Sequence, residues 1–125
     1  MKLELKKMLF KECHLAGRQY YDVNEVWNDL QIGTLLRLER IDNNPKDENA
    51  IGVFFDKHTE VDGETELTTY FLGYVPAVDN KEMAKLMDMG WGNIFECRIC
   101  KINPQAHYEN QIYFTIRIRR NEANQ

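Results

Sequence analysis

Hydrophobic and polar residues alternate along most of this chain with the two-residue period that is typical of β-strands. The alternation is regular near the C-terminus and only approximate near the N-terminus, where a phase slip at Lys6-Lys7 predicts a bulge. Short strands separated by turn residues favour a mainly β fold, a small antiparallel β-barrel. We predict about six strands, over residues 2–13, 34–41, 50–56, 67–75, 93–102 and 111–119.

Helical periodicity is confined to two short regions. Residues 79–89 carry apolar side chains at three- to four-residue spacing and are followed by Gly90, which predicts a helix that covers one opening of the barrel. Residues 22–31 predict a shorter helical turn. Residues 57–66 are rich in acidic side chains and predict a hairpin loop with Asp62-Gly63 at its tip. The expected architecture is therefore a β-barrel with one or two helices.

The totals for the chain limit its organisation and its partners. Its 125 residues fit a single domain, which we place at residues 1–120, with a polar tail at 121–125. The net charge of −4 argues against non-specific coating of nucleic acid, but it is compatible with a small pocket for one or two nucleotides. No apolar run is long enough to span a bilayer and no secretory h-region is present, so we expect a cytoplasmic protein without membrane contact.

Residues that could support catalysis or bind a metal are scattered. The three cysteines are expected to be reduced, and Cys97 and Cys100 lack two further zinc ligands at suitable spacing. The chain contains no serine, which excludes a serine nucleophile. The acidic residues Asp42, Asp47 and Glu48 could hold Mg²⁺ for a nuclease, the alternative that we favour least. We therefore expect no enzymatic activity, no cofactor and no bound metal.

Two short segments carry the candidate binding chemistry. The first includes Arg18, Gln19, Tyr20 and Tyr21 at the end of a predicted strand. Paired tyrosines can stack on bases, and an arginine beside them can hold phosphate. Taken alone, the pair is better explained as apolar rings that close one end of a barrel.

The second segment runs from Asp42 to Ala50 and includes Asn44, Lys46 and Asp47. Asn and Asp side chains bond nearby backbone, so the segment taken alone is best explained as a well-bonded turn. A carboxylate can also accept a hydrogen bond from a free sugar hydroxyl, and it repels a phosphate at the same place. Asp47 is therefore a candidate for recognising the end of a strand.

Taken together, the two segments resemble the HIRAN domain family in its free-standing bacterial type. The similarity continues through Ala50-Ile51-Gly52-Val53, through Leu72-Gly73-Tyr74-Val75-Pro76 and through the helix that ends at Gly90, and it covers roughly residues 8–119. The resemblance implies an OB-like barrel and, as in the eukaryotic member of the family, recognition of the 3′-hydroxyl end of single-stranded DNA. It implies a role in DNA repair or replication-fork processing, beside a helicase or nuclease that acts on the same DNA.

The resemblance also assigns site residues. Tyr20 and Tyr21 match the paired aromatics that contact the terminal nucleotides, Asp47 matches the carboxylate that meets the 3′-hydroxyl, and Asn44 matches an asparagine of the same loop. This chain departs from the eukaryotic member at Gln19, Lys46 and Tyr74, which replace arginine, tyrosine and histidine. The implied nucleic-acid-binding set is Arg18, Gln19, Tyr20, Tyr21, Asn44, Lys46, Asp47 and Tyr74. The alternative function is a protein-interaction module on the same barrel, which the negative net charge would suit.

Overall fold

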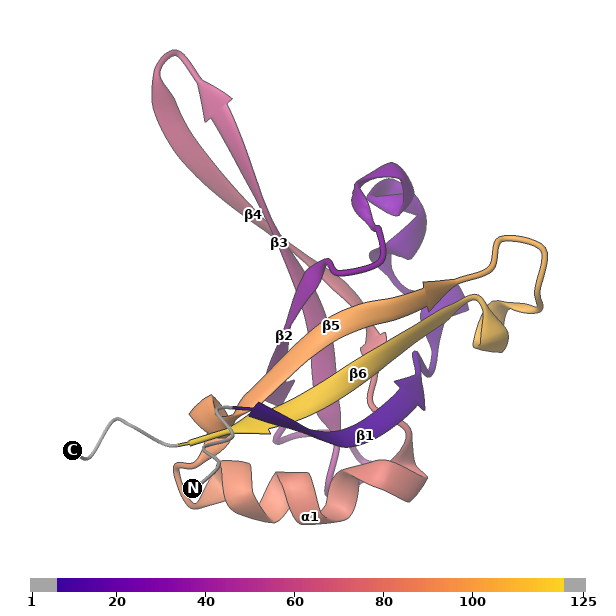
Figure 1. Ribbon diagram of the computed structural model, residues 1–125, viewed down its shortest axis with the longest axis vertical. Helices are drawn as coiled ribbons and strands as arrows, with labels where there is room; N and C mark the ends of the chain where they lie inside the picture. Colours follow the sequence, from indigo (N-terminus) through magenta and orange to yellow (C-terminus); the bar gives the residue numbers. More distant parts are fainter. Residues whose placement is uncertain (1–6, 121–125) are drawn as a thin grey trace, which may run out of the picture.

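The computed structural model describes residues 7–120. Within this range six β-strands and one α-helix are joined by short 3-10 segments (Figure 1). The strands are β1 (Lys7–His14), β2 (Leu35–Arg40), β3 (Ile51–Val61), β4 (Glu64–Tyr74), β5 (Phe95–Ile102) and β6 (Ile112–Arg119), and the helix is α1 (Ala77–Asp88). The 3-10 segments are η1 (Arg18–Tyr20), η2 (Asp22–Glu25), η3 (Trp27–Asp29), η4 (Gly92–Ile94) and η5 (Tyr108–Asn110). The predicted mainly β class is confirmed.

All six strands form one antiparallel sheet in the order β1-β6-β5-β2-β3-β4. The prediction of a barrel needs a minor correction, because the sheet is strongly curved but not closed. The chain leaving β1 meets β4 at a single bridge, Ala16 to Tyr74, and β2 pairs with β5 through only two register positions. The bulge predicted at Lys6-Lys7 involves a position outside the described residues. Within these residues β1 carries a bulge between Leu9 and Lys11.

The hairpin of β3 and β4 is longer than its sequence suggested. Residues 57–66 were predicted as a loop, but ten register pairs join β3 to β4 as far as the pair Val61–Glu64. The turn lies at Asp62-Gly63, as predicted, and both residues have positive φ values of 54° and 81°. Cross-strand pairing therefore extends to the turn despite the acidic side chains, and the distal part of the hairpin projects beyond the rest of the molecule (Figure 1).

The core lies on the inner face of the curved sheet. The alternation seen in the sequence places Cys97, Ile99, Phe114 and Ile116 inward, all at most 1 % exposed. Burying a side chain of this size contributes roughly 1.5–3 kcal/mol to folding. Helix α1 lies across one end of the sheet, opposite the projecting hairpin, and adds Met83 to the core (Figure 1).

The region predicted as one helical turn, residues 22–31, forms the separate 3-10 segments η2 and η3. Its buried side chains are Val23, Val26 and Leu30, and neither segment has a side-chain cap. β-branched valines lose side-chain freedom in a helix, which disfavours a continuous α-helix here. The region closes the core beside the first candidate segment.

Candidate nucleic-acid interface

The first candidate segment is held against the end of β4 by a close backbone approach. Ala16 and Tyr74 exchange two backbone hydrogen bonds, from N–H to carbonyl oxygen, of 3.0 and 2.8 Å. A Cβ atom at Gly73 would lie 2.3 Å from the Ala16 carbonyl oxygen, so only glycine permits this contact. Gly17 then adopts the left-handed conformation (φ 74°) and turns the chain into η1.

This turn places the predicted tyrosine pair beside Tyr74. The ring of Tyr21 lies edge-on to Tyr74, with centroids 5.7 Å apart, and is 37 % exposed. Tyr20 is 77 % exposed and projects from the same turn. A hydrogen bond with Tyr74, together with burial, raises the pKa of Tyr21, whereas the nearby Lys46 ammonium lowers it. The Lys46 charge is therefore close enough to act on the Tyr21 hydroxyl.

The second candidate segment is a hydrogen-bonded turn. The Asn44 side-chain oxygen accepts a hydrogen bond of 2.9 Å from the Lys46 backbone N–H. The Asp47 carboxylate accepts one of 2.9 Å from the Asn49 backbone N–H and another of 2.8 Å from the side-chain amide of Asn80, a residue of α1 that is 1 % exposed. The Lys46 side chain is exposed. Asn44 and Asp47 thus fix the shape of the turn, as the structural interpretation predicted.

Arg40 stabilises this turn by hydrogen bonds, and the sequence analysis did not predict Arg40 as a site residue. Its guanidinium donates to the carbonyl oxygens of Ala50 (2.6 Å) and Glu48 (2.9 Å), and it also forms a bidentate ion pair with Asp88. The Asp88 hydrogen bonds raise the pKa of Arg40, with a further contribution from the charge of Asp47. The available sequence signal was an arginine that continues the apolar face of the predicted strand 34–41.

The two segments meet at Tyr74. This residue pairs with Gly52 at the start of β3, directly after the turn at residues 42–50, and it bridges to Ala16 on its other side. Tyr20, Tyr21, Lys46 and Tyr74 therefore come from three parts of the sequence and share one corner of the sheet.

Arg18 and Gln19 complete the predicted set of site residues. Arg18 is only 5 % exposed, its guanidinium lies 5.1 Å from the ring centroid of Trp27 and 5.3 Å from that of Tyr108, and it donates a 2.9 Å hydrogen bond to Asn24. Burial lowers the pKa of Arg18. It therefore supports η1 from beneath. Gln19 belongs to η1, and its side chain lies outside what the structure describes.

A stack of aromatic rings beside Tyr21 was also missed. The Tyr21 ring lies 4.4 Å from Phe71, and Phe71 lies 4.9 Å from Phe54 with an interplanar angle of 18°. The Arg37 guanidinium covers Phe54 at 5.1 Å. Phe54 and Phe71 are partly buried but do not belong to the core cluster. The cross-strand pairing of Phe54 with Phe71 was not predictable, because a bulge between Val53 and Phe54 shifts the register.

Comparison with known proteins decides the family. A family model described as the HIRAN domain matches residues 10–119. The chain belongs to the HIRAN domain family. A crystal structure of a protein from Lactobacillus plantarum has a similar fold, with a TM-score of 0.67 and 21 % sequence identity over 90 % of this chain and 94 % of the other. A search of curated proteins gives no match.

The HIRAN assignment confirms the predicted family and the coarse function. A HIRAN domain is generally a nucleic-acid-binding module, a binding domain rather than a catalytic one. In residues 7–120 no helix is long and apolar enough to cross a membrane. Over the same residues no group of three or more histidine, cysteine or acidic side chains is placed to hold a metal ion.

Proposed function

We propose that this HIRAN domain binds the 3′-hydroxyl end of single-stranded DNA at the corner formed by Tyr20, Tyr21, Tyr74, Lys46 and Asp47. The observation that carries the proposal is the meeting of two distant segments at Tyr74. The exposed rings and the turn that carries Lys46 and Asp47 are thereby brought to neighbouring segments, and rings, a cation and a carboxylate are the groups that recognition of a terminal nucleotide uses.

Each residue has a distinct role in this proposal. Tyr20 is exposed and offers its ring to a base, while Tyr21 and Tyr74 form the wall of the site. Lys46 contacts the last internucleotide phosphate. Arg18 is a positioning residue, because its burial between Trp27 and Tyr108 favours support of η1 over direct contact with DNA.

Asp47 selects the free hydroxyl. Its two oxygens each accept one hydrogen bond within the protein, and a carboxylate can accept about four. A terminal hydroxyl can therefore donate to it, whereas a terminal phosphate would be repelled. Two unit charges 4 Å apart interact by about 4 kcal/mol near a protein surface, far more than the roughly 1.4 kcal/mol that gives a tenfold preference.

The test is a fluorescence-polarisation titration of oligonucleotides labelled at the 5′ end and carrying either a 3′-hydroxyl or a 3′-phosphate. We expect the hydroxyl form to bind at least about tenfold more tightly. Asp47→Asn should reduce this preference. Asp42→Asn, which removes the same charge from an exposed residue of the same turn, should leave it unchanged. Equal binding of both ends by the unmodified protein would refute end selection.

The biological setting follows from the ligand. Free 3′ ends of DNA arise in repair and at replication forks, where a helicase or nuclease acting on the same DNA is the expected partner. The alternative function, a protein-interaction module on the same sheet, is favoured by the exposed acidic residues of the projecting hairpin. The two functions differ in salt dependence, since DNA binding weakens steeply as ionic strength rises.

A further inference from the structure

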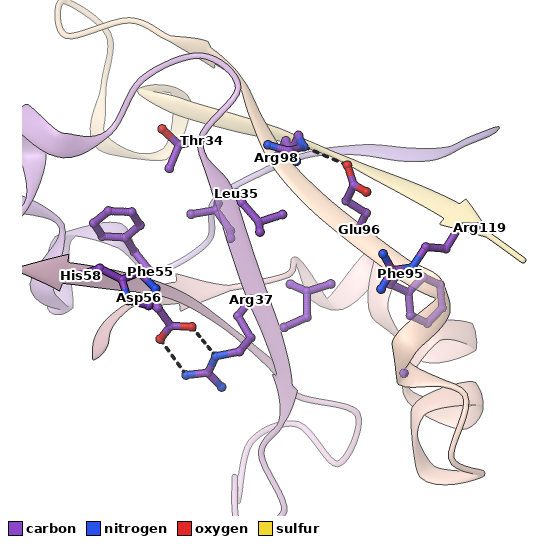
Figure 2. A pocket seen from close by; sticks show the side chains of 13 residues that line it. Thr34, Leu35, Arg37, Phe55, Asp56, His58, Phe95, Glu96, Arg98 and Arg119 are labelled. Atoms are coloured by element: carbon purple, nitrogen blue, oxygen red, sulfur yellow. Dashed lines mark hydrogen bonds and ion pairs between the residues drawn. The ribbon is translucent and has the colours of Figure 1, made fainter. Parts of the chain in front are cut away.

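A groove with a volume of about 620 Å³ opens between β2 and β5 (Figure 2). It exists because these strands pair only at Leu35–Arg98 and Leu36–Cys97 and then diverge. Figure 2 shows Arg37 and Asp56 on one side of β2, and Arg98, Glu96 and Arg119 on the other. The groove is therefore distinct from the corner occupied by the tyrosines.

The lining of the groove combines an apolar surface with arginines. The apolar residues come from β2, β3 and β5, and Leu35 among them is 55 % exposed. Arg37, Arg98 and Arg119 contribute three guanidinium groups. Apolar surface flanked by cations suits a single nucleic-acid strand, whose bases leave water while its phosphates stay at charged edges. The apolar lining residues are Leu35, Leu36, Leu38, Phe55 and Phe95.

The two carboxylates of the groove are already matched by cations. Asp56 accepts two hydrogen bonds from Arg37, of 2.7 and 3.1 Å, and these lower its pKa. Glu96 is bound by Lys7 at 2.6 Å and by Arg98 at 2.8 Å. Arg37 also forms an ion pair with Glu39, which does not line the groove. With the partners Lys7 and Glu39 included, four cations face three carboxylates, although the whole protein is acidic.

A chain of side-chain contacts links the groove to the proposed end site. Arg37 lines the groove and also covers Phe54, which begins the ring stack that leads through Phe71 to Tyr21. The Arg37 guanidinium lies 5.1 Å from the Phe54 ring centroid. The ring centroids of Phe54 and Phe71 are 4.9 Å apart, and those of Phe71 and Tyr21 are 4.4 Å apart. Stacked nucleotides advance by about 3.4 Å each, so a strand of a few nucleotides spans this distance.

A path along the projecting hairpin, away from the groove, is unfavourable for a nucleic-acid strand. Beyond the ring stack its exposed side chains include Glu60, Asp62, Glu64 and Glu66. Phosphates that followed the hairpin would approach these carboxylates, whereas phosphates that turn at Arg37 would approach Arg98 and Arg119. The charge distribution thus favours one path away from the end site.

We propose that the groove between β2 and β5 holds the nucleotides that precede the bound 3′ end, with Arg37, Arg98 and Arg119 contacting their phosphates. This proposal rests on the proposed function, because the end site sets where the strand begins. It predicts that the protein distinguishes longer single strands from very short ones.

The test compares oligothymidylates of 3 and 12 nucleotides, each with a 3′-hydroxyl, by fluorescence polarisation at several salt concentrations. The unmodified protein should bind the longer strand at least about tenfold more tightly and with a steeper salt dependence. The double variant Arg98→Gln/Arg119→Gln should lose this length advantage, and its salt slope should fall by about 0.7 for each phosphate contact removed. Its affinity for the trimer and its preference for 3′-hydroxyl over 3′-phosphate should not change.

Three further variants make the result specific. Lys81→Gln/Lys85→Gln removes the same charge from exposed positions of α1 and should keep the length advantage. Leu35→Glu places a negative charge in the groove without removing any hydrogen bond and should abolish the advantage, while Leu35→Gln should weaken it less. This pair keeps the test valid if the arginine variant folds poorly.

Several outcomes would overturn the proposal. The groove is excluded if the arginine and Leu35→Glu variants bind the 12-mer as the unmodified protein does, or if the lysine variant loses as much. A change of oligomeric state in the groove variants, measured by light scattering, with DNA binding intact would assign the groove to a second copy of the chain. Length-dependent binding without end preference would remove the proposed end selection but retain the groove. No binding at any length would exclude both.

Discussion

Removal of the Asp47 carboxylate should destabilise the protein as well as alter its binding, because Asp47 connects the turn at residues 42–50 to α1. In Asp47→Ala the side-chain amide of Asn80, 1 % exposed, loses its acceptor. A buried group left without a partner costs about 1–3 kcal/mol. The lost bond to the Asn49 N–H adds about 0.5–1.5 kcal/mol. We expect a total loss of about 2–4 kcal/mol.

Urea denaturation at neutral pH, followed by circular dichroism, measures this loss. A change of about 3 kcal/mol shifts the midpoint by roughly 1–3 M urea for a small domain. Asp42→Asn, in the same turn but exposed, should change stability by less than about 0.5 kcal/mol. Asp47→Asn keeps one accepting oxygen and should fall between the two, which is why it is the better variant for the binding test.

A double-mutant cycle with Asn80→Ala isolates the contact itself. If the bond of 2.8 Å between Asp47 and Asn80 carries the effect, the double variant should be less destabilised than the sum of the single variants, by about 1 kcal/mol or more. Strict additivity, or a loss below about 0.5 kcal/mol in Asp47→Ala, would refute the view that this carboxylate holds the turn on α1. A strongly destabilised Asp47→Ala that still folds would also explain lost binding without any contact to DNA.

Two further predictions concern the frame of the site and its groove. Gly73→Ala places a Cβ atom 2.3 Å from a backbone carbonyl oxygen at a φ of 153°, so we expect a loss of at least about 2 kcal/mol in urea denaturation and weaker DNA binding, while Gly90→Ala, which meets no close atom, should cost less. Glu96 has a pKa lowered to about 2 by hydrogen bonds from Lys7 and Arg98, below its value in an unfolded chain. Its contribution, about 1 kcal/mol after allowance for the exposure of both cations, is present above about pH 4.5 and lost as pH falls towards 2. Glu96→Gln should therefore match the unmodified protein at pH 2 and be less stable at pH 7, and a difference that does not depend on pH would contradict this assignment.

The strands were predictable because alternation alone decides which side chains face the core. Residues 93–102 and 111–119 were predicted within two residues of β5 and β6, and their inward residues are the buried ones. The helix was placed within two residues at its start. Periodicity could not reveal the length of the hairpin, since residues 57–66 pair through their backbones while their polar side chains remain exposed.

The resemblance predicted the candidate site as a set of residues but not their arrangement. The resemblance placed Tyr20, Tyr21 and Asp47 together, and the structure brings their two segments to Tyr74. The resemblance could not show that Arg18 is buried. The contacts of this side chain with two rings do not alter the pattern of apolar and polar residues around it in the sequence. The Phe54–Phe71 stack depends on a register shift, which a single sequence does not encode as a local signal.

The net negative charge of the chain is compatible with a binding site that depends on a few local contacts. A protein of net charge −4 gains little from general attraction to a polyanion, so affinity must come from a few local contacts that exist only where cations and rings meet. Here those contacts lie along a line from Lys46 through the ring stack to Arg37, and the acidic hairpin stands beside it. Duplex DNA would bring many phosphates near the hairpin carboxylates, whereas a single strand can follow the line. Under the proposed function, this charge distribution would favour a single strand over a duplex, and the carboxylate of Asp47 would need only to distinguish the end of that strand.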